Sequence, residues 1–291
     1  MIDDRQQDVN IVPNKNVDEI QEPFSYENPK NWVKQYPQCG GKNQSPIAIN
    51  TNKTIPIDIP AIIFGEYDTH LSEDLTLENN GHTITFRIPP TVKNSLPYIT
   101  NGPLKGKYEA INVHFHWGAP LEKGSEHQIN NKRFDLEMHI LHKNTKYSSV
   151  EEALEYDDGL AVIAVLFKVH KLKNRASSLG LQTIFDIVPY VFGFNTTATT
   201  SKFITLGSLL PNISRENYYT YQGSLTTPPC SEAVSWLVYP EAIPIPLYYM
   251  RNFWGVLDED GQLLYNNFRT LQPIHLRKVY VRKQTKKCCN A

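Results

Sequence analysis

The stretch Val113-His114-Phe115-His116-Trp117 places two histidines two residues apart in a segment of strand-forming residues. Side chains two apart along an extended strand share a face, so His114 and His116 point the same way and Phe115 points the other way. Glu137-Met138-His139, further along the chain, has the same spacing, with a carboxylate and a third histidine. If the two strands pair, three imidazoles converge with a carboxylate behind one of them.

Three neutral nitrogen ligands with a fourth position open to water are typical of a catalytic zinc site. A structural zinc site more often closes all four positions, usually with cysteines. Here Cys39, Cys230 and the pair Cys288-Cys289 are too widely spaced for a cysteine-based zinc framework. The alternative is that the His-x-His pattern is only a pair of solvent-facing strand histidines.

The composition of the 291-residue chain is that of an ordinary globular protein. The net charge of −1 gives no electrostatic reason to expect binding to nucleic acid or to anionic lipid. The sequence has no apolar run of about 18 residues, so it predicts no transmembrane helix. Asn52, Asn195 and Asn212 begin glycosylation sequons, which matter only if the chain is secreted.

Strand patterns outnumber helical ones. Residues 83–88 alternate, as a half-buried strand does, and residues 161–167 are continuously apolar, as a strand buried on both faces would be. Residues 148–156 begin with a capping-box pattern and predict a short helix, and residues 177–189 predict another. The pattern favours a mostly β protein with short helices.

Both ends of the chain differ from its middle. Residues 1–22 are too polar for a signal peptide and are predicted to form a solvated, disordered lead-in. Residues 281–291 are predicted to form a basic, solvated tail that ends with Cys288-Cys289 and two further residues. Lipidation of that cysteine pair is the alternative, but Asn290 stands where a prenylation motif has an aliphatic residue.

Eight motifs occur in order along the chain. They are Gln44-Ser45-Pro46-Ile47, Asn80-Gly81-His82, His114-Phe115-His116-Trp117-Gly118, Gly124-Ser125-Glu126-His127, Glu137-Met138-His139, Asp158-Gly159-Leu160-Ala161-Val162, Gly223-Ser224-Leu225-Thr226-Thr227-Pro228-Pro229 and Asn267-Phe268-Arg269. Together they closely resemble the α-class carbonic anhydrases, over about Tyr26 to Arg277. The resemblance implies a single domain over residues 23–280, built on a large, twisted, mainly antiparallel central sheet with zinc in a cleft. It implies reversible hydration of carbon dioxide to bicarbonate and a proton.

The resemblance assigns His114, His116 and His139 as zinc ligands. It also implies a group that orients each of them, because ligating imidazoles are held through their other nitrogen. Glu137 would accept a hydrogen bond from His139, Asn112 would serve His114, and the backbone carbonyl of Asn267 would serve His116. Asn112 departs from the family, in which a longer Gln is commoner, so its contact is expected to be lost or to run through water.

Glu126 and Thr226 match the family's catalytic pair. If the Thr226 hydroxyl donates to ionised Glu126, its oxygen accepts from the attacking nucleophile and orients it. Thr227 would contact bicarbonate. His82 matches the proton-shuttle position, for which the ordinary pKa of histidine is suited. The resemblance further implies that Tyr26 and Asn80 order the waters along the proton path.

The remaining site residues are apolar, as a pocket for carbon dioxide should be. Leu141 is bulkier than the Val often found at its position, so the pocket is expected to be slightly tighter. Without the resemblance, all five residues read as ordinary core. They are Leu141, Val162, Leu225, Val234 and Trp236.

The other histidines are interpreted as structural or exposed. His127 is expected to be buried and structural. His142 lies three residues from His139 and so should face the other side of its strand. His70, His170 and His275 are given no catalytic role.

Cys39 and Cys230 fall where extracellular members of the family carry their disulfide. A disulfide implies an oxidising compartment, and hence an extracellular or secretory location. The polar N-terminus points the other way, and a cytoplasmic enzyme with two free thiols is the alternative. The expected partner is only the small substrate, carbon dioxide or bicarbonate, and a monomer is expected. A catalytically silent, carbonic-anhydrase-related binding module is the alternative function, which the intact ligand set argues against.

Overall fold

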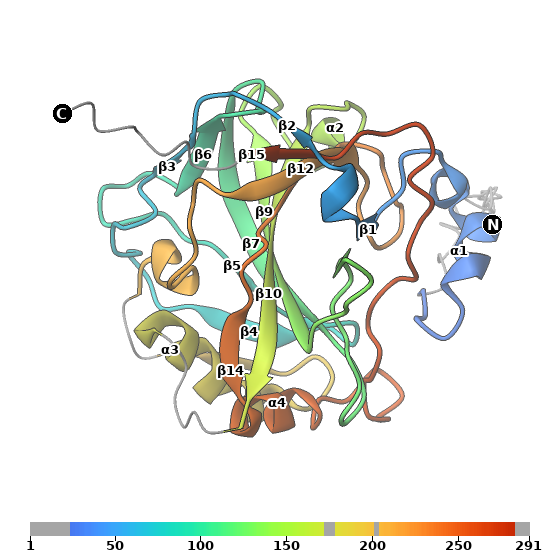
Figure 1. Cartoon of the computed structure of the whole chain (residues 1–291). Helices are drawn as coiled ribbons and strands as arrows, with labels where there is room; N and C mark the ends of the chain where they lie inside the picture. Colours follow the sequence, from blue (N-terminus) through green and yellow to red (C-terminus); the bar gives the residue numbers. More distant parts are fainter. Residues whose placement is uncertain (1–23, 172–177, 201–203, 283–291) are drawn as a thin grey trace, which may run out of the picture.

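A computed structural model describes residues 24–171, 178–200 and 204–282. The predicted lead-in of residues 1–22 and the end of the tail, with Cys288-Cys289, lie outside the described residues. Within those residues, thirteen strands form one twisted sheet (Figure 1). This confirms the predicted mostly β fold.

Ten of these strands, counted in the described residues, form a continuous path across the sheet. β6 (Tyr98–Asn101) also pairs with β7 and carries β3 (Ile62–Gly65), and β14 (Ile243–Pro246) pairs with β10. In spatial order the ten are β11 (Thr197–Thr199), β4 (Thr76–Asn79), β5 (Ile84–Arg87), β7 (Lys107–Trp117), β9 (Leu136–Asn144), β10 (Leu160–His170), β13 (Val234–Val238), β12 (Tyr218–Gly223), β15 (Tyr280–Arg282) and β2 (Ile55–Pro56).

Most neighbouring strands are antiparallel, as expected. β10 nevertheless pairs in parallel with β13 and β14, and β15 pairs in parallel with β2. A separate two-stranded sheet joins β1 (Ala48–Ile49) to β8 (Gln128–Ile129). The continuously apolar stretch lies within β10, whose residues 160–167 are all buried, and the alternating stretch contains β5.

Helices are short, because the chain offers few long amphipathic stretches. Both predicted helices form: α2 (Val150–Ala153), where the Ser149 hydroxyl accepts from the Glu152 backbone N–H, and α3 (Leu179–Ile187). None of the described helices is long and apolar enough to cross a membrane. The other helical segments are α1 (Trp32–Gln35), α4 (Leu247–Phe253) and the 3₁₀ turns Pro29–Asn31, Pro37–Gly40, Thr51–Lys53, Val188–Val191 and Leu206–Leu209.

The two faces of the sheet have different surroundings. One face packs Val113, Phe115, Met138 and Ile140 into the main apolar core, which also includes residues of α3 and α4. These two helices lie together at one end of the sheet in Figure 1. His114 and His116 of β7 and His139 of β9 therefore lie on the opposite face, beside a second apolar cluster that contains Trp236.

Candidate metal centre

A β-bulge in β7 decides which face carries the histidines. Ala110 pairs with His142 of β9, but the next paired residue is Asn112, so Ile111 is an extra residue in the strand. Before the bulge the even-numbered Tyr108 and Ala110 are buried in the main core, and after it the odd-numbered residues are. Because one inserted residue reverses the alternation, His114 and His116 face away from that core.

The register between β7 and β9 brings the three predicted ligands together. His114 lies directly opposite His139, and His116 lies opposite Glu137. Nδ1 of His139 is 3.1 Å from Nε2 of His116 and 3.3 Å from Nε2 of His114. Tetrahedral zinc with Zn–N bonds of about 2.05 Å separates its nitrogen ligands by about 3.3 Å. The three imidazoles therefore fit a zinc ion.

The surroundings favour the neutral form of His114 and His139, the form in which histidine binds a metal. Burial, with the neighbouring His139 and His116, holds the pKa of His114 well below its ordinary value. Burial also lowers the pKa of His139, although Glu137 partly opposes this. Both of these rings thus retain a lone pair for a cation.

Each ligand is also held through the nitrogen that points away from the cluster. Nε2 of His139 lies 2.7 Å from Oε1 of Glu137, and Nδ1 of His116 lies 2.7 Å from the carbonyl oxygen of Asn267. Nδ1 of His114 reaches Oδ1 of Asn112 directly, so the expectation that this contact would be lost or run through water is wrong. At 3.4 Å the hydrogen bond is long, because the Asn side chain is short. These contacts select the ring nitrogens that converge.

Glu137 is itself fixed by His127, which is fully buried, as predicted. Nδ1 of His127 lies 2.6 Å from Oε1 of Glu137, and the backbone N–H of His127 donates to Oε2 of Glu137 at 2.8 Å. Nε2 of His127 lies 2.7 Å from the hydroxyl of Tyr221. Burial raises the pKa of Glu137, but His127 and His139 outweigh it and hold the pKa well below its usual range. His127, Glu137 and His139 could also group around a cation, but these hydrogen bonds already occupy their ligand atoms.

Glu126 is buried next to the ligands. Its Oε1 accepts from the backbone N–H of Arg269 at 2.8 Å. Its Oε2 lies 3.5 Å from Nε2 of His116 and has no hydrogen-bond partner among the described residues. Thr226 is buried, and the hydrogen bond between it and Glu126 that the resemblance implies is not formed here, so that bond stays a prediction.

The five apolar residues predicted to receive carbon dioxide belong to one cluster. Val162, Val234 and Trp236 are buried in it, and Leu141 and Leu225 are partly buried against it. The Trp236 ring lies 4.9 Å from the ring of His139, which places this cluster beside the ligands. Thr227 is half-buried in the loop that follows Leu225.

His82 lies on the turn between β4 and β5. Oδ1 of Asn80 accepts the backbone N–H of His82 at 3.0 Å, and Gly81 has a φ of +83°, which favours glycine. The ring of His82 stacks on Phe24, with centroids 4.1 Å apart, and Tyr26 lies 6.4 Å away. Burial lowers the pKa of His82, while Glu259 opposes this.

Cavities adjoin this turn on two sides. Tyr26 and His82 line one of about 660 Å³, and the acidic Glu259 belongs to the same lining. Asn80 and Asn112 line another of about 640 Å³. The predicted proton-path residues therefore have space for water beside them.

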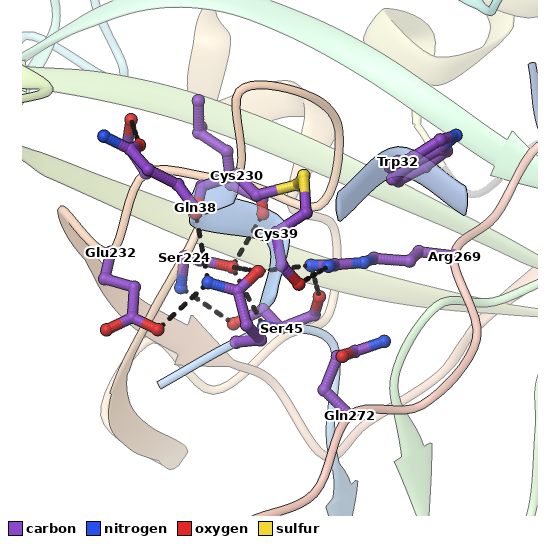
Figure 2. The surroundings of a disulfide bond; sticks show 12 residues. Trp32, Gln38, Cys39, Ser45, Ser224, Cys230, Glu232, Arg269 and Gln272 are labelled. Carbon is purple, nitrogen blue, oxygen red and sulfur yellow. Dashed lines mark hydrogen bonds between the residues drawn. A yellow bond between two sulfur atoms is a disulfide. The ribbon is translucent and has the colours of Figure 1, made fainter. Parts of the chain in front are cut away.

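Cys39 and Cys230 form the predicted disulfide, with their Cα atoms 4.9 Å apart (Figure 2). The bridge holds the 3₁₀ turn of Cys39 against the loop that carries Thr226. That loop is closed further by hydrogen bonds from the Leu225 N–H to the Ser231 carbonyl and from the Cys230 N–H to the Thr227 carbonyl.

The remaining histidines agree with the sequence-based interpretation. His142 is buried on the far face of β9, where its Nε2 contacts the Tyr67 hydroxyl at 2.5 Å. His275 is exposed. The residues that sequence reasoning missed are Phe24, Tyr221 and Arg269. Only Arg269 had a signal, as the last residue of a quoted motif.

Comparisons with known proteins agree with this geometry. The profile of the eukaryotic-type carbonic anhydrases matches residues 27–283. Carbonic anhydrase 15 of Mus musculus is 35% identical over 259 residues, which cover 86% of this chain and 78% of that protein. Carbonic anhydrase 7 of Mus musculus is 35% identical over 261 residues, covering 86% and 92%. The chain belongs to the eukaryotic-type carbonic anhydrase family.

Proposed function

We propose that this protein is an active, zinc-dependent enzyme that hydrates carbon dioxide reversibly to bicarbonate and a proton. The observation that carries the proposal is the convergence of ligand nitrogens of His114, His116 and His139 at distances that suit tetrahedral zinc. All three lie on one face of the sheet, beside a buried carboxylate and an apolar cluster.

His114, His116 and His139 would hold the ion as neutral ligands. Bound zinc makes water a nucleophile near neutral pH, and carbonic anhydrases are the standard example of this effect. Glu137, Asn112 and the Asn267 carbonyl keep the rings in the orientation that leaves the ligand lone pairs inward.

Glu126 and Thr226 would orient the nucleophile. Oε1 of Glu126 already accepts a backbone N–H, whereas Oε2 has no partner among the described residues and is free to accept a hydrogen bond from the Thr226 hydroxyl. The Thr226 oxygen then has to act as an acceptor for the attacking water. This fixes the direction of the nucleophile's lone pair toward the carbon of carbon dioxide.

The substrate would rest on the apolar side chains of Leu141, Val162, Leu225, Val234 and Trp236, and Thr227 would contact the bicarbonate product. His82 would then take the released proton through ordered water near Tyr26 and Asn80 and pass it to buffer.

The disulfide supports a location in an oxidising compartment, either the secretory pathway or outside the cell. Glycosylation at Asn52, Asn195 or Asn212 would agree with this location. Zinc, carbon dioxide and bicarbonate are the only partners proposed.

The decisive experiment is stopped-flow measurement of carbon dioxide hydration with and without a zinc chelator, together with elemental analysis. The native protein should contain one zinc per chain and lose its activity when the metal is removed. His116→Ala should lose both zinc and nearly all hydration. A metal-free His116→Ala protein with native activity would refute the proposal.

A further inference from the structure

The segment Asn267–Arg269, called here the strap, contacts both the ligand set and Glu126. The Asn267 carbonyl accepts from His116, and its side-chain Oδ1 accepts from the Trp117 N–H at 2.6 Å. Two residues on, the backbone N–H of Arg269 donates to Oε1 of Glu126 at 2.8 Å. The position of the strap therefore sets both a ligand ring and the catalytic carboxylate.

The guanidinium of Arg269 ties the strap to the N-terminal segment. Nη1 donates to Oε1 of Gln44 at 2.8 Å and to the Ser45 carbonyl at 2.9 Å, and Nη2 donates to the Cys39 carbonyl at 2.9 Å. Figure 2 shows this side chain extended toward Cys39, next to the disulfide. The carbonyl of Cys230, the other half of that bridge, accepts from Nε2 of Gln44 at 3.1 Å.

Burying this charge is costly for the fold. Arg269 is only 2% exposed, its three acceptors are neutral oxygens, and its Nε has no hydrogen-bond partner among the described residues. A buried cation with incomplete hydrogen bonding destabilises unless the surrounding field compensates it. Burial lowers the pKa of Arg269 to about 10, and the nearby Glu126 opposes this shift. The opposite charge of Glu126 thus favours the cation at this position.

We propose that Arg269 is a positioning residue for the reaction, whose guanidinium anchors the strap so that its backbone N–H holds Oε1 of Glu126 and leaves Oε2 for Thr226. The inference rests on the proposed function. The guanidinium of Arg269 also donates to the carbonyl of Cys39, which is half of the disulfide. One residue therefore contacts both the disulfide segment, through its side chain, and the carboxylate of Glu126, through its backbone N–H.

The test compares Arg269→Met with Arg277→Met. Arg277 is the matched control, because it also bonds the N-terminal segment, at the Gln44 carbonyl at 2.8 Å. Its other acceptors are the carbonyls of Pro273, Ile274 and Gln222, and none of its hydrogen bonds goes to Glu126. Both variants lose a guanidinium that bonds the same segment, although that of Arg277 is only half-buried. Only the first loses the anchor of the strap.

Hydration is measured per zinc-bound chain. Arg269→Met should keep its zinc but lose at least about 10-fold in kcat/KM, because small misplacements of orienting groups slow the chemical step. Its kcat in weak buffer should fall less, since proton export rather than the hydration step limits turnover there. A merely destabilised enzyme would lose kcat and kcat/KM equally. Arg277→Met should stay within about two-fold of the native kcat/KM.

A second readout does not depend on activity. Hydrogen–deuterium exchange of the amide at position 269 should be slow in the native protein and in Arg277→Met, and at least about 10-fold faster in Arg269→Met. The amide of Ile163 in the central strand β10 serves as the reference for global unfolding, because it should not change. If Arg269→Met does not fold, Arg269→Lys replaces it, with a smaller change in the same direction.

The proposal is overturned if Arg269→Met keeps native kcat/KM per zinc, if Arg277→Met loses as much, or if the amide at 269 stays protected in Arg269→Met. An inactive native enzyme would refute the proposed function instead, and the exchange experiment would still decide whether the guanidinium anchors the strap.

Discussion

Removal of the Cys39–Cys230 bridge is expected to lower the free energy of unfolding without removing zinc. The two cysteines are 191 residues apart in the sequence, so the bridge closes a very long loop in the unfolded chain. In the chain-entropy account, a loop of that length is worth at most about 5 kcal/mol. For a chain of 291 residues this corresponds to a fall in melting temperature of roughly 8 °C.

The measurement is equilibrium urea unfolding of the native protein, Cys39→Ala, Cys230→Ala and the double variant. Because the effect lies in the unfolded chain, both single variants and the double variant should lose the same free energy, within about 1 kcal/mol. The urea m-value should rise, since an unfolded chain without the crosslink exposes more surface. Zinc content should stay at one per chain, because neither sulfur is a ligand.

Two results would refute this reasoning. An unchanged unfolding midpoint would show that the bridge does not restrict the unfolded chain. If the double variant loses as much free energy of unfolding as the two single variants together, the cysteines act through separate native contacts rather than through their crosslink.

Three further predictions follow from single side chains. Glu137→Gln should weaken zinc binding by about 10- to 100-fold in a chelator competition, because the anion no longer orients its histidine; unchanged affinity would contradict the assigned contact. His82→Ala should slow turnover in weak buffer, with partial rescue by imidazole and little change in kcat/KM; an equal loss of both without rescue would place this residue elsewhere in the mechanism. Burial lowers the pKa of His142 to about 3, so its neutral form stabilises the fold above the ordinary histidine pKa, and this stability is lost as the pH falls from about 6.5 toward 3. The free energy of unfolding in urea should therefore depend less on pH in His142→Phe than in the native protein, by up to about 1.4 kcal/mol per pH unit between pH 6.5 and 3. An equal pH dependence in the two proteins would contradict this assignment.

Local patterns in the sequence were enough to predict several features. Alternation along residues 113–117 and 137–139 correctly placed each pair of polar side chains on one strand face, because that periodicity is a local property of extended backbone. The continuously apolar stretch gave a fully buried β10, and the capping pattern gave α2. The family resemblance supplied the sheet, the disulfide pair and the motif that ends with Arg269.

Other features follow only from how distant segments meet. Alternation predicts which residues share a face but not which face meets the core, and the bulge at Ile111 made that choice by reversing the parity within β7. The register that sets His114 opposite His139 comes from strand pairing, which carries no signature within either strand alone.

The contacts of Phe24 and Arg269 also depend on how distant segments of the chain meet. Phe24 stacks on His82 from a segment 58 positions earlier (82 − 24), and Arg269 bonds a carbonyl at Cys39, 230 positions away. The residue types at these positions make each contact chemically possible. Only the folded chain brings the partners within reach, because contacts between residues so far apart in sequence depend on the packing of every element between them. The sequence thus determined the types of the ligand residues and which of them share a strand face. The tertiary structure decided that these residues converge, and which groups hold them in place.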